Sequence, residues 1–256
     1  MIVDPPSPAP YNMAADEALA DSCRRGASGP TVRVYGWERR SISLGYFQRP
    51  DQVVDLDRCR DAGIPVVRRI TGGRAVFHHH EVTYSVVAPV PHPRFPPTIR
   101  GTYEVIANAL EAALVSLGLP VARRDRDPER LRHGTGSPFC FDATSSHELT
   151  LDGLKVVGNA QRRWPTAFLQ HGSILLRFDP SDAAPWFRSA AGDPGSLTGL
   201  CASRDDLTRE EVCRALIASW ERLFDVELLP GEISADEAVA VAETSHARDL
   251  TVTQPV

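Results

Sequence analysis

The chain carries two β-rich runs close together, RRITGGRAVFH at residues 68–78 and VTYSVV at residues 82–87. A pair of glycines interrupts the first run, and because glycine adopts positive φ at little cost, an ordinary tight turn explains the pair. The donors Arg69, Thr71 and Arg74 favour a second interpretation, because successive backbone N–H groups in a turn, joined by guanidinium groups, bind anionic or carbonyl-bearing ligands. The run therefore predicts two strands around a turn that lines a binding site.

The composition is ordinary for a globular enzyme, since 42% of the 256 residues are hydrophobic and 24% are charged. No stretch approaches the roughly 18 consecutive apolar residues that span a bilayer, and the N-terminus lacks the basic and apolar regions of a signal peptide. We therefore expect a cytoplasmic protein. The formal net charge of −5 argues against a broad nucleic-acid-binding surface, although the arginine clusters at 123–126 and 162–163 can receive an acidic partner.

Strands outnumber helices along the chain and occur as hairpins. Apolar residues that recur every three or four positions predict an amphipathic helix over 103–117, and Asn12 is expected to cap the first helix, which Gly26 ends. Alternation and turn signals predict strands at 31–37, 41–46, 64–70, 75–79, 82–88, 147–151, 154–157 and 168–178, and capping boxes at Thr208 with Glu211 and Ser234 with Glu237. The predicted fold is α+β, a mixed, largely antiparallel β-sheet flanked by helices, with a catalytic domain at 11–229 and a peripheral C-terminal helix and tail at 230–256.

Three consecutive histidines, His78, His79 and His80, suggest a metal site. Alternate side chains of a strand point to opposite faces, so only His78 and His80 share a face, and two histidines without a third ligand make a poor metal site. We expect no metal, and we place His78 in the cleft because it continues the glycine turn. A serine triad within 142–147 is rejected, because no GxSxG elbow is present and the residues lie too close in sequence to converge.

The five cysteines are odd in number and widely spaced, and no two of them form a CxxC pair. This pattern indicates reduced thiols rather than a disulfide framework or a zinc site. Cys23, Cys59 and Cys213 lie in predicted helices, where a small buried thiol is usual. Cys140 lies in the turn-rich segment 137–145, and reactive thiols favour such accessible positions.

A thiol nucleophile needs its pKa lowered from about 8.5, and a nearby ammonium does this by stabilising the thiolate. Lys155 is the candidate, because it follows a hairpin turn predicted at Asp152 and Gly153 that can fold it back toward Cys140. The alternative is that Lys155, like most lysines just after a hairpin turn, is exposed to solvent.

Four segments resemble successive signatures of the biotin/lipoate protein ligase family: NMAADEAL at 12–19, SLGYFQ at 43–48, the run at 68–78 and KVVGNAQ at 155–161. Their order also matches that family, over roughly residues 11–179. Within it, CFDA at 140–143 followed by Glu148, Leu149 and Lys155 resembles the cysteine-dependent octanoyltransferases of the LipM type more than the ATP-dependent lipoate ligases.

The resemblance implies an octanoyl-acyl carrier protein:protein N-octanoyltransferase in lipoate biosynthesis that needs no cofactor. The Cys140 thiolate would attack the donor thioester, and a lysine of an apo lipoyl domain or glycine-cleavage H protein would then take the octanoyl group as an amide. Lys155 would lower the pKa of Cys140 and orient the acyl carbonyl, while backbone donors near Gly158 and Gln161 would serve the oxyanion. The substrate-binding residues that the resemblance implies are Arg69, Thr71, Gly72, Gly73, Arg74, Ala75, His78, Gly158, Ala160 and Gln161.

Two departures from the family pattern leave acyl-chain and acceptor preference open. Residues 144–147 stand where a proline and aromatic residues are usual, and His79 replaces a common aspartate. The main rival function is an ATP-dependent lipoate–protein ligase of the same fold, in which Lys155 contacts the acyl adenylate and Cys140 is incidental. A lipoyl amidotransferase, which also uses a cysteine, is a second rival function, and a non-catalytic binding module is a third.

Overall fold

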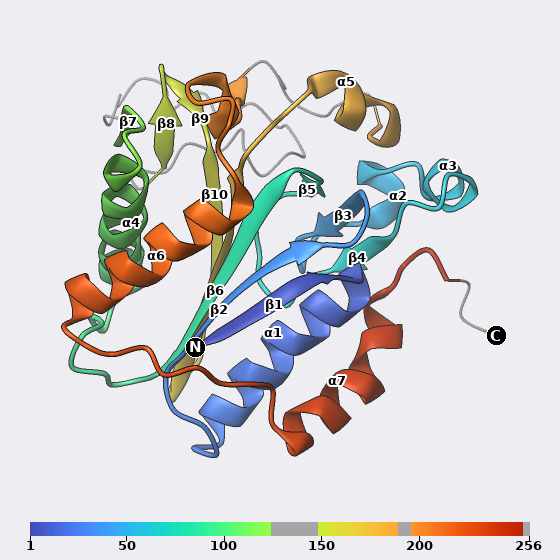
Figure 1. The fold of residues 1–256 in the computed structure, drawn as a ribbon. Helices are drawn as coiled ribbons and strands as arrows, with labels where there is room; N and C mark the ends of the chain where they lie inside the picture. The colour runs from blue at the N-terminus through green and yellow to red at the C-terminus, as the bar shows by residue number, and fades with distance from the viewer. Residues whose placement is uncertain (124–147, 189–195, 253–256) are drawn as a thin grey trace.

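The computed structural model describes residues 1–123, 148–188 and 196–252, and its centre is a five-stranded sheet (Figure 1). The strands follow the order β1 (Ile2–Ser7), β2 (Thr31–Trp37), β6 (Glu81–Pro89), β11 (Ala167–Leu175) and β10 (Val157–Arg163). β1 runs parallel to β2, and the other neighbours are antiparallel. The predicted α+β class, with a mixed and largely antiparallel sheet, is confirmed.

Two small sheets flank the central one and carry the sequence motifs. One has the order β4 (Val66–Arg68), β3 (Ser41–Leu44) and β5 (Val76–His78), so the glycine turn joins its two outer strands. The other has the order β7 (Val121–Arg123), β8 (Leu149–Leu151) and β9 (Leu154–Lys155). Residues 68–78 thus form two strands around a turn, as the sequence predicts, although each strand is shorter than expected.

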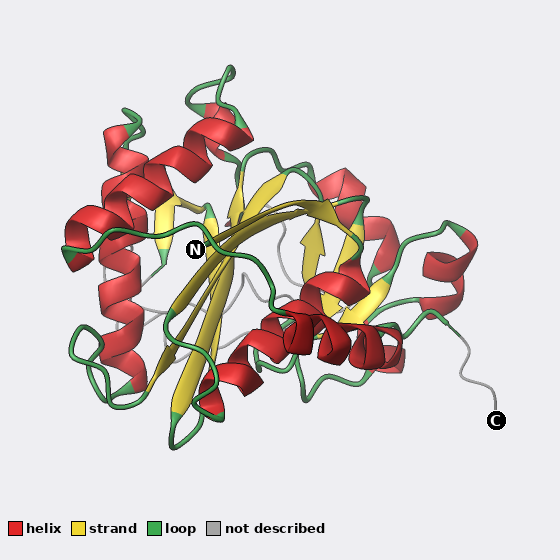
Figure 2. Ribbon diagram, turned by 60° about the horizontal axis from the view of Figure 1, so that its bottom comes forward, coloured by secondary structure: helices red, strands yellow, loops and turns green. Residues whose placement is uncertain are grey.

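Helices cover both faces of the central sheet (Figure 2). α4 (Ile99–Ser116) and α6 (Arg209–Phe224) pack on one face, where Ile106 and Trp220 meet Val34 and Tyr84 of the sheet. α1 (Ala9–Arg24) covers the other face.

None of the described helices has the length and apolar character of a membrane span. The short helical segments are α2 (Pro50–Val53), α3 (Leu56–Asp61), α5 (Pro180–Ala183), η3 (Ala184–Trp186) and η5 (Leu200–Ala202).

The N-terminus differs from the sequence-based expectation. The prolines of β1 are tolerated because this is an edge strand, where a missing N–H leaves no ladder bond broken. α1 starts at Ala9, three residues before the expected cap, and Asn12 is buried within it. The Asn12 amide instead donates to the carbonyl oxygens of Ser7 (3.2 Å) and Gly36 (2.8 Å), which ties α1 to two strands. The capping role predicted for Asn12 is therefore wrong.

The predicted turns and caps agree with the structure. Gly26 has φ of 74° just after the end of α1, and Asp152 and Gly153 have φ of 52° and 80° between β8 and β9. These positive values are those that a two-residue hairpin turn requires. Both predicted capping boxes are present, at Thr208 before α6 and at Ser234 before α7 (Ala235–Arg248).

The C-terminal helix α7 packs on the outer side of α1. Val241 of α7 lies among Ala14, Ala15 and Ala18, and the small side chains of α1 allow the close approach. An Arg248–Glu17 ion pair joins the two helices near their ends. The division of the chain into a catalytic domain at 11–229 and a peripheral segment at 230–256 stays a prediction.

A buried charge pair joins α1 to the central sheet. Arg33 of β2 and Asp16 of α1 are both almost fully buried, and Arg33 Nη1 donates to Asp16 Oδ1 at 3.0 Å. Arg33 also donates to the side chains of Asp4 (2.7 Å) and Asn12 (2.9 Å), and its guanidinium lies 3.9 Å from the ring centre of Tyr35. The charge of Arg33 is thus balanced inside the core.

Asp16 receives four hydrogen bonds from four different side chains. Arg33 and Ser85 donate to Oδ1, and Tyr35 and His171 donate to Oδ2, at distances between 2.8 and 3.0 Å. Burial alone would raise the pKa of Asp16, but the hydrogen bond from His171 and the charge of Arg33 lower it. Asp16 therefore stays ionised at neutral pH and holds α1, β2, β6 and β11 together.

We predict that Asp16→Asn lowers the free energy of unfolding by about 3 kcal/mol, because it removes the charge that balances buried Arg33. Because the pKa of Asp16 is lower in the folded chain than in the unfolded chain, its contribution is complete above about pH 4 and is lost as the pH falls further. Urea unfolding at pH 7 and pH 3 measures both effects. The control Asp51→Asn removes only an exposed pair with Arg49, and equal losses in the two variants would contradict the prediction.

Candidate active site

The glycine turn is shaped by close contact between two backbone segments. Gly73 has φ of 92°, which only glycine adopts without strain. A Cβ atom built on Gly45 would lie 1.9 Å from the carbonyl oxygen of Gly73. Both glycines are therefore required, one for its backbone conformation and the other for the space that it leaves.

Arg69 holds this turn in place. Its Nη1 donates to the carbonyl and hydroxyl oxygens of Ser43, both at 2.8 Å, and its Nη2 donates to the carbonyls of Gly72 (3.1 Å) and Arg74 (2.8 Å). Arg68 similarly donates to three carbonyls of residues 45–48. The guanidinium of Arg69, which the sequence suggests as a ligand donor, thus binds the backbone around the turn.

A narrow cavity of about 30 Å³ lies between this turn and the central sheet. Four of the predicted binding residues line it, namely Arg69, His78, Gly158 and Ala160, together with residues such as Trp37 and His171. Thr71 reaches the same wall through His171, since its Oγ1 lies 2.7 Å from His171 Nε2. The predicted residues that do not line the cavity are Thr71, Gly72, Gly73, Arg74, Ala75 and Gln161. Gln161 Nε2 instead donates to Gln170 Oε1 at 2.9 Å.

His78 belongs to a polar cluster at one side of the cavity. Its Nδ1 donates to Glu81 Oε1 (2.9 Å), its Nε2 lies 2.7 Å from Ser43 Oγ, and Trp37 stacks on its ring at 3.7 Å between centroids. Burial lowers the pKa of His78 although Glu81 acts in the opposite direction, so the ring is neutral at pH 7. Glu81 Oε1 also accepts from Trp37, Thr83 and Ser173.

The polar side chains of the cavity wall thus hydrogen-bond mainly with one another. Ser43, Thr83 and Ser173 each donate or accept within the Glu81–His78 cluster, and His171 is held by Asp16 and Thr71. Most of these polar atoms therefore have partners within the protein, whereas Glu81 Oε2 is buried without one. Met13, Val76 and Ala160 add apolar surface to the lining.

Lys155 is buried, which excludes the solvent-exposed alternative. Only 2% of its surface is accessible, and its Nζ forms an ion pair with Glu148 Oε1. The pair spans the β8–β9 hairpin, because Glu148 directly precedes β8 and Lys155 ends β9. The hairpin therefore folds Lys155 inward, as its predicted role requires. Cys140 lies outside the described residues, so its distance from Lys155 is untested.

The other four cysteines are buried and suited to structural roles. Cys23, Cys59 and Cys213 lie in α1, α3 and α6, as predicted. Burial raises the pKa of each thiol, to about 11 in the case of Cys59, and also raises the pKa of Cys201. These thiols are mostly protonated at neutral pH and are poor nucleophiles.

The histidine run does not form a metal site in the part of the chain that the structure describes. His78 is buried in its cluster, whereas His79 Nδ1 lies 3.4 Å from Asp182 and its ring packs against His80. Groups of three or more potential metal ligands are absent from the described residues.

Comparison with known proteins places these features in a family. The sequence profile of the lipoyl protein ligase A/B catalytic domain matches residues 8–220. The chain belongs to this family, and the resemblance inferred from the four sequence segments is confirmed.

Individual relatives are similar over most of their length. The octanoyltransferase LipM of Staphylococcus aureus is 42% identical over 250 residues, which cover 92% of this chain and 90% of the relative. The octanoyltransferase LipM of Macrococcus caseolyticus is 38% identical over 240 residues, which cover 88% of this chain and 87% of the relative.

Solved structures share the fold. Lipoate-protein ligase A bound with ATP has a TM-score of 0.78 at 23% identity, over 95% of this chain and 92% of that one. A putative lipoate protein ligase from Thermoplasma acidophilum with bound lipoic acid has a TM-score of 0.77 at 24% identity, over 95% and 91% of the two chains. At this level of identity these likenesses show the fold alone.

Sequence reasoning missed several residues that build the site. Asp16 lies within the signature at 12–19, but its part in the wall depends on His171, which is 155 positions away in the chain. Trp37 and Glu81 also escaped notice, because their contacts with His78 form only when β2, β5 and β6 come together. The sequence does offer two signals for such residues. One is an acidic residue within a predicted helix that is buried in the fold, and the other is a tryptophan at the end of a predicted strand.

We predict that Gly45→Ala destabilises the chain by about 2 kcal/mol, because the added methyl group would overlap the Gly73 carbonyl and push the turn away from the cavity. Thermal unfolding measures the loss. Gly29→Ala is the control, since a Cβ atom there meets nothing within 4 Å. If both variants melt at the same temperature as the parent, the close approach at Gly45 is not required.

We also predict that Glu148→Gln lowers the free energy of unfolding by about 3 kcal/mol, because the Lys155 ammonium would lose its buried carboxylate partner. Glu38→Gln removes only an exposed pair with Arg39 and should change stability by less than about 1 kcal/mol. Denaturant titration of the two variants compares these values, and a Glu148→Gln chain as stable as the Glu38→Gln chain would contradict the prediction.

Proposed function

We propose that this chain moves an octanoyl group from an acyl carrier protein thioester to a lysine of a lipoyl domain or of the glycine-cleavage H protein, through an acyl thioester on Cys140. In the first step the Cys140 sulfur bonds to the acyl carbon while the carrier thiolate leaves and takes up a proton. In the second step the neutral amine of the acceptor lysine attacks the acyl carbon and forms the amide, the Cys140 thiolate leaves, and the proton lost by the nitrogen passes to solvent. Both steps transfer an already activated acyl group, so ATP is not needed.

The relatives support this activity. The octanoyltransferases LipM of two bacterial species match about nine tenths of the chain, so the predicted octanoyltransferase of lipoate biosynthesis, an acyltransferase, is confirmed. The acceptor is a lipoyl protein. The donor, the dependence on a cysteine and the cytoplasmic location stay predictions.

The observation that carries the proposed mechanism is the burial of Lys155. An ammonium group inside the protein stabilises a nearby thiolate more strongly than one in water, because less solvent screens its charge. Glu148 fixes the position of the ammonium. The four described cysteines all have raised pKa values, which leaves Cys140 as the candidate that Lys155 would activate.

The position of β10 supports an oxyanion site near Gly158 and Gln161. β10 is an edge strand of the five-stranded sheet as described, and it starts two residues after Lys155. In an antiparallel strand, alternate N–H groups point away from the paired neighbour, so part of the backbone of β10 can donate to a developing negative charge. Gly158 and Ala160 also line the narrow cavity, so the same strand would contact both the acyl chain and its carbonyl.

We predict that incubation of the protein with octanoyl-acyl carrier protein adds one octanoyl group to Cys140. Intact-mass measurement followed by peptide mapping locates the adduct, and Cys140→Ser should abolish it. Cys23→Ser is the matched control, because the Cys23 thiol is buried in α1 with a raised pKa and should not be acylated. An adduct on another residue, or transfer to the acceptor by the Cys140→Ser chain, would contradict the proposed mechanism.

We predict that Lys155→Met slows formation of the adduct by about a hundredfold, because the thiolate would lose its stabilising cation. The rate of iodoacetamide alkylation of Cys140 as a function of pH should show a higher thiol pKa in this variant. Lys155→Arg keeps a cation and should therefore keep part of the lowering of the Cys140 thiol pKa. A purely structural role for Lys155 would not produce this result. An unchanged alkylation profile in Lys155→Met would remove Lys155 from the mechanism.

A further inference from the structure

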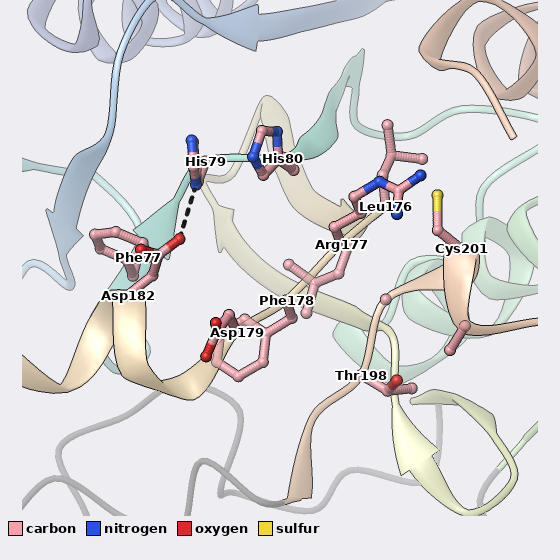
Figure 3. A pocket seen from close by; sticks show the side chains of 13 residues that line it. Phe77, His79, His80, Leu176, Arg177, Phe178, Asp179, Asp182, Thr198 and Cys201 are labelled. Carbon is pink, nitrogen blue, oxygen red and sulfur yellow. Dashed lines mark ion pairs between the residues drawn. The ribbon is translucent and has the colours of Figure 1, made fainter. Parts of the chain in front are cut away.

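A second and larger cavity lies beside the proposed site (Figure 3). It encloses about 390 Å³ between the end of β5 and the segment that follows β11. Phe77, Leu175 and Phe178 supply apolar walls, and His80 and Thr198 supply polar groups. In Figure 3 the labelled side chains lie around one space, with His79 and His80 on one side and Thr198 and Cys201 on another. The cavity therefore offers both apolar surface and hydrogen-bonding groups.

Two backbone hydrogen bonds place this cavity next to Lys155. Thr198 N donates to the Lys155 carbonyl at 3.1 Å, and Leu175 N donates to the Val156 carbonyl at 2.9 Å. Leu175 also packs with Leu197 and Val76, and Val76 lines the narrow cavity. The larger cavity thus adjoins the backbone at Lys155, and the contact between Leu175 and Val76 separates it from the narrow cavity.

The charges around the larger cavity do not suit a nucleotide triphosphate. The one guanidinium in its described wall, that of Arg177, pairs with Asp205 at 2.8 Å. Asp182 pairs with Arg40 and lies near His79, and burial lowers the pKa of His79 so that it is uncharged at pH 7. Sites for transferable phosphates supply an excess of cations, which the described wall of this cavity lacks.

We propose that this cavity receives the arm of the acyl donor, an uncharged pantetheine chain that ends in the thioester. This inference rests on the proposed function. A pantetheine chain carries two amides, a hydroxyl group and a branched hydrocarbon segment, so it needs apolar walls with both donors and acceptors and no surplus charge. Histidine and threonine side chains provide the donors and acceptors, and the aromatic and leucine side chains provide the apolar contact. The terminal phosphate of the carrier would lie outside, at the solvent side.

The test compares two octanoyl thioesters that differ only in the arm. Octanoyl-pantetheine carries the whole uncharged chain, whereas octanoyl-N-acetylcysteamine carries only the part next to the sulfur. The quantity measured is the ratio of kcat/KM for the two thioesters in transfer to an apo lipoyl domain. We expect octanoyl-pantetheine to be favoured about tenfold, the effect of one or two additional well-made hydrogen bonds.

A variant that fills the cavity tests whether the preference for octanoyl-pantetheine arises there. Ala202 is exposed and lines the cavity, so Ala202→Phe should fill part of it and bring the ratio close to one. Ser203→Phe adds the same ring at the next exposed position, which does not line the cavity, and should leave the ratio unchanged. Circular dichroism of both variants checks that they fold.

The outcomes separate this inference from the proposed function. Transfer from neither thioester would reject the proposed function itself. Equal kcat/KM values for the two thioesters in the parent chain, or the same ratio in Ala202→Phe and the parent, would reject the donor-arm site while leaving the transferase intact. Saturable binding of ATP that Ala202→Phe abolishes would overturn the inference, because the cavity would then be a nucleotide site.

Discussion

The buried carboxylate of Asp16 connects the parts of the molecule that form the site. It accepts hydrogen bonds from Arg33, Tyr35, Ser85 and His171, so a single ionised group on α1 fixes three strands of the central sheet. His171 in turn holds Thr71 at the start of the glycine turn. Removing a buried charge from such a network leaves its partners unsatisfied, so both the fold and the cavity wall depend on this group.

Buried polar groups are also paired with one another around the narrow cavity. His78, Ser43 and Glu81 bind one another, and Arg69 donates to the carbonyls of the turn, so most polar groups of the wall have partners within the protein. The larger cavity differs, because its polar groups lie at the surface beside apolar side chains. The backbone of Lys155 adjoins the larger cavity, because Thr198 of its wall donates to the Lys155 carbonyl at 3.1 Å.

The strands around the glycine turn and the hairpin at Asp152 and Gly153 could be predicted from the sequence, because turn residues and alternation are local signals. The edge strand β1 was missed, since its prolines argue against a strand and only pairing with β2 forms it. Of the predicted binding residues, Arg69, His78, Gly158 and Ala160 line the narrow cavity, whereas Arg74 and Gln161 do not. Contacts such as that of Asp16 with His171 join residues far apart in the chain, and no local pattern encodes them.

The central claim is that the acyl group reaches the acceptor from a thioester and not from an adenylate. The most direct measurement is the mass of an apo lipoyl domain after incubation with this protein and octanoyl-acyl carrier protein in nucleotide-free buffer. The account predicts that the domain gains one octanoyl amide and that added ATP does not raise the rate. Modification that occurs only with free octanoate or lipoate and ATP would contradict it.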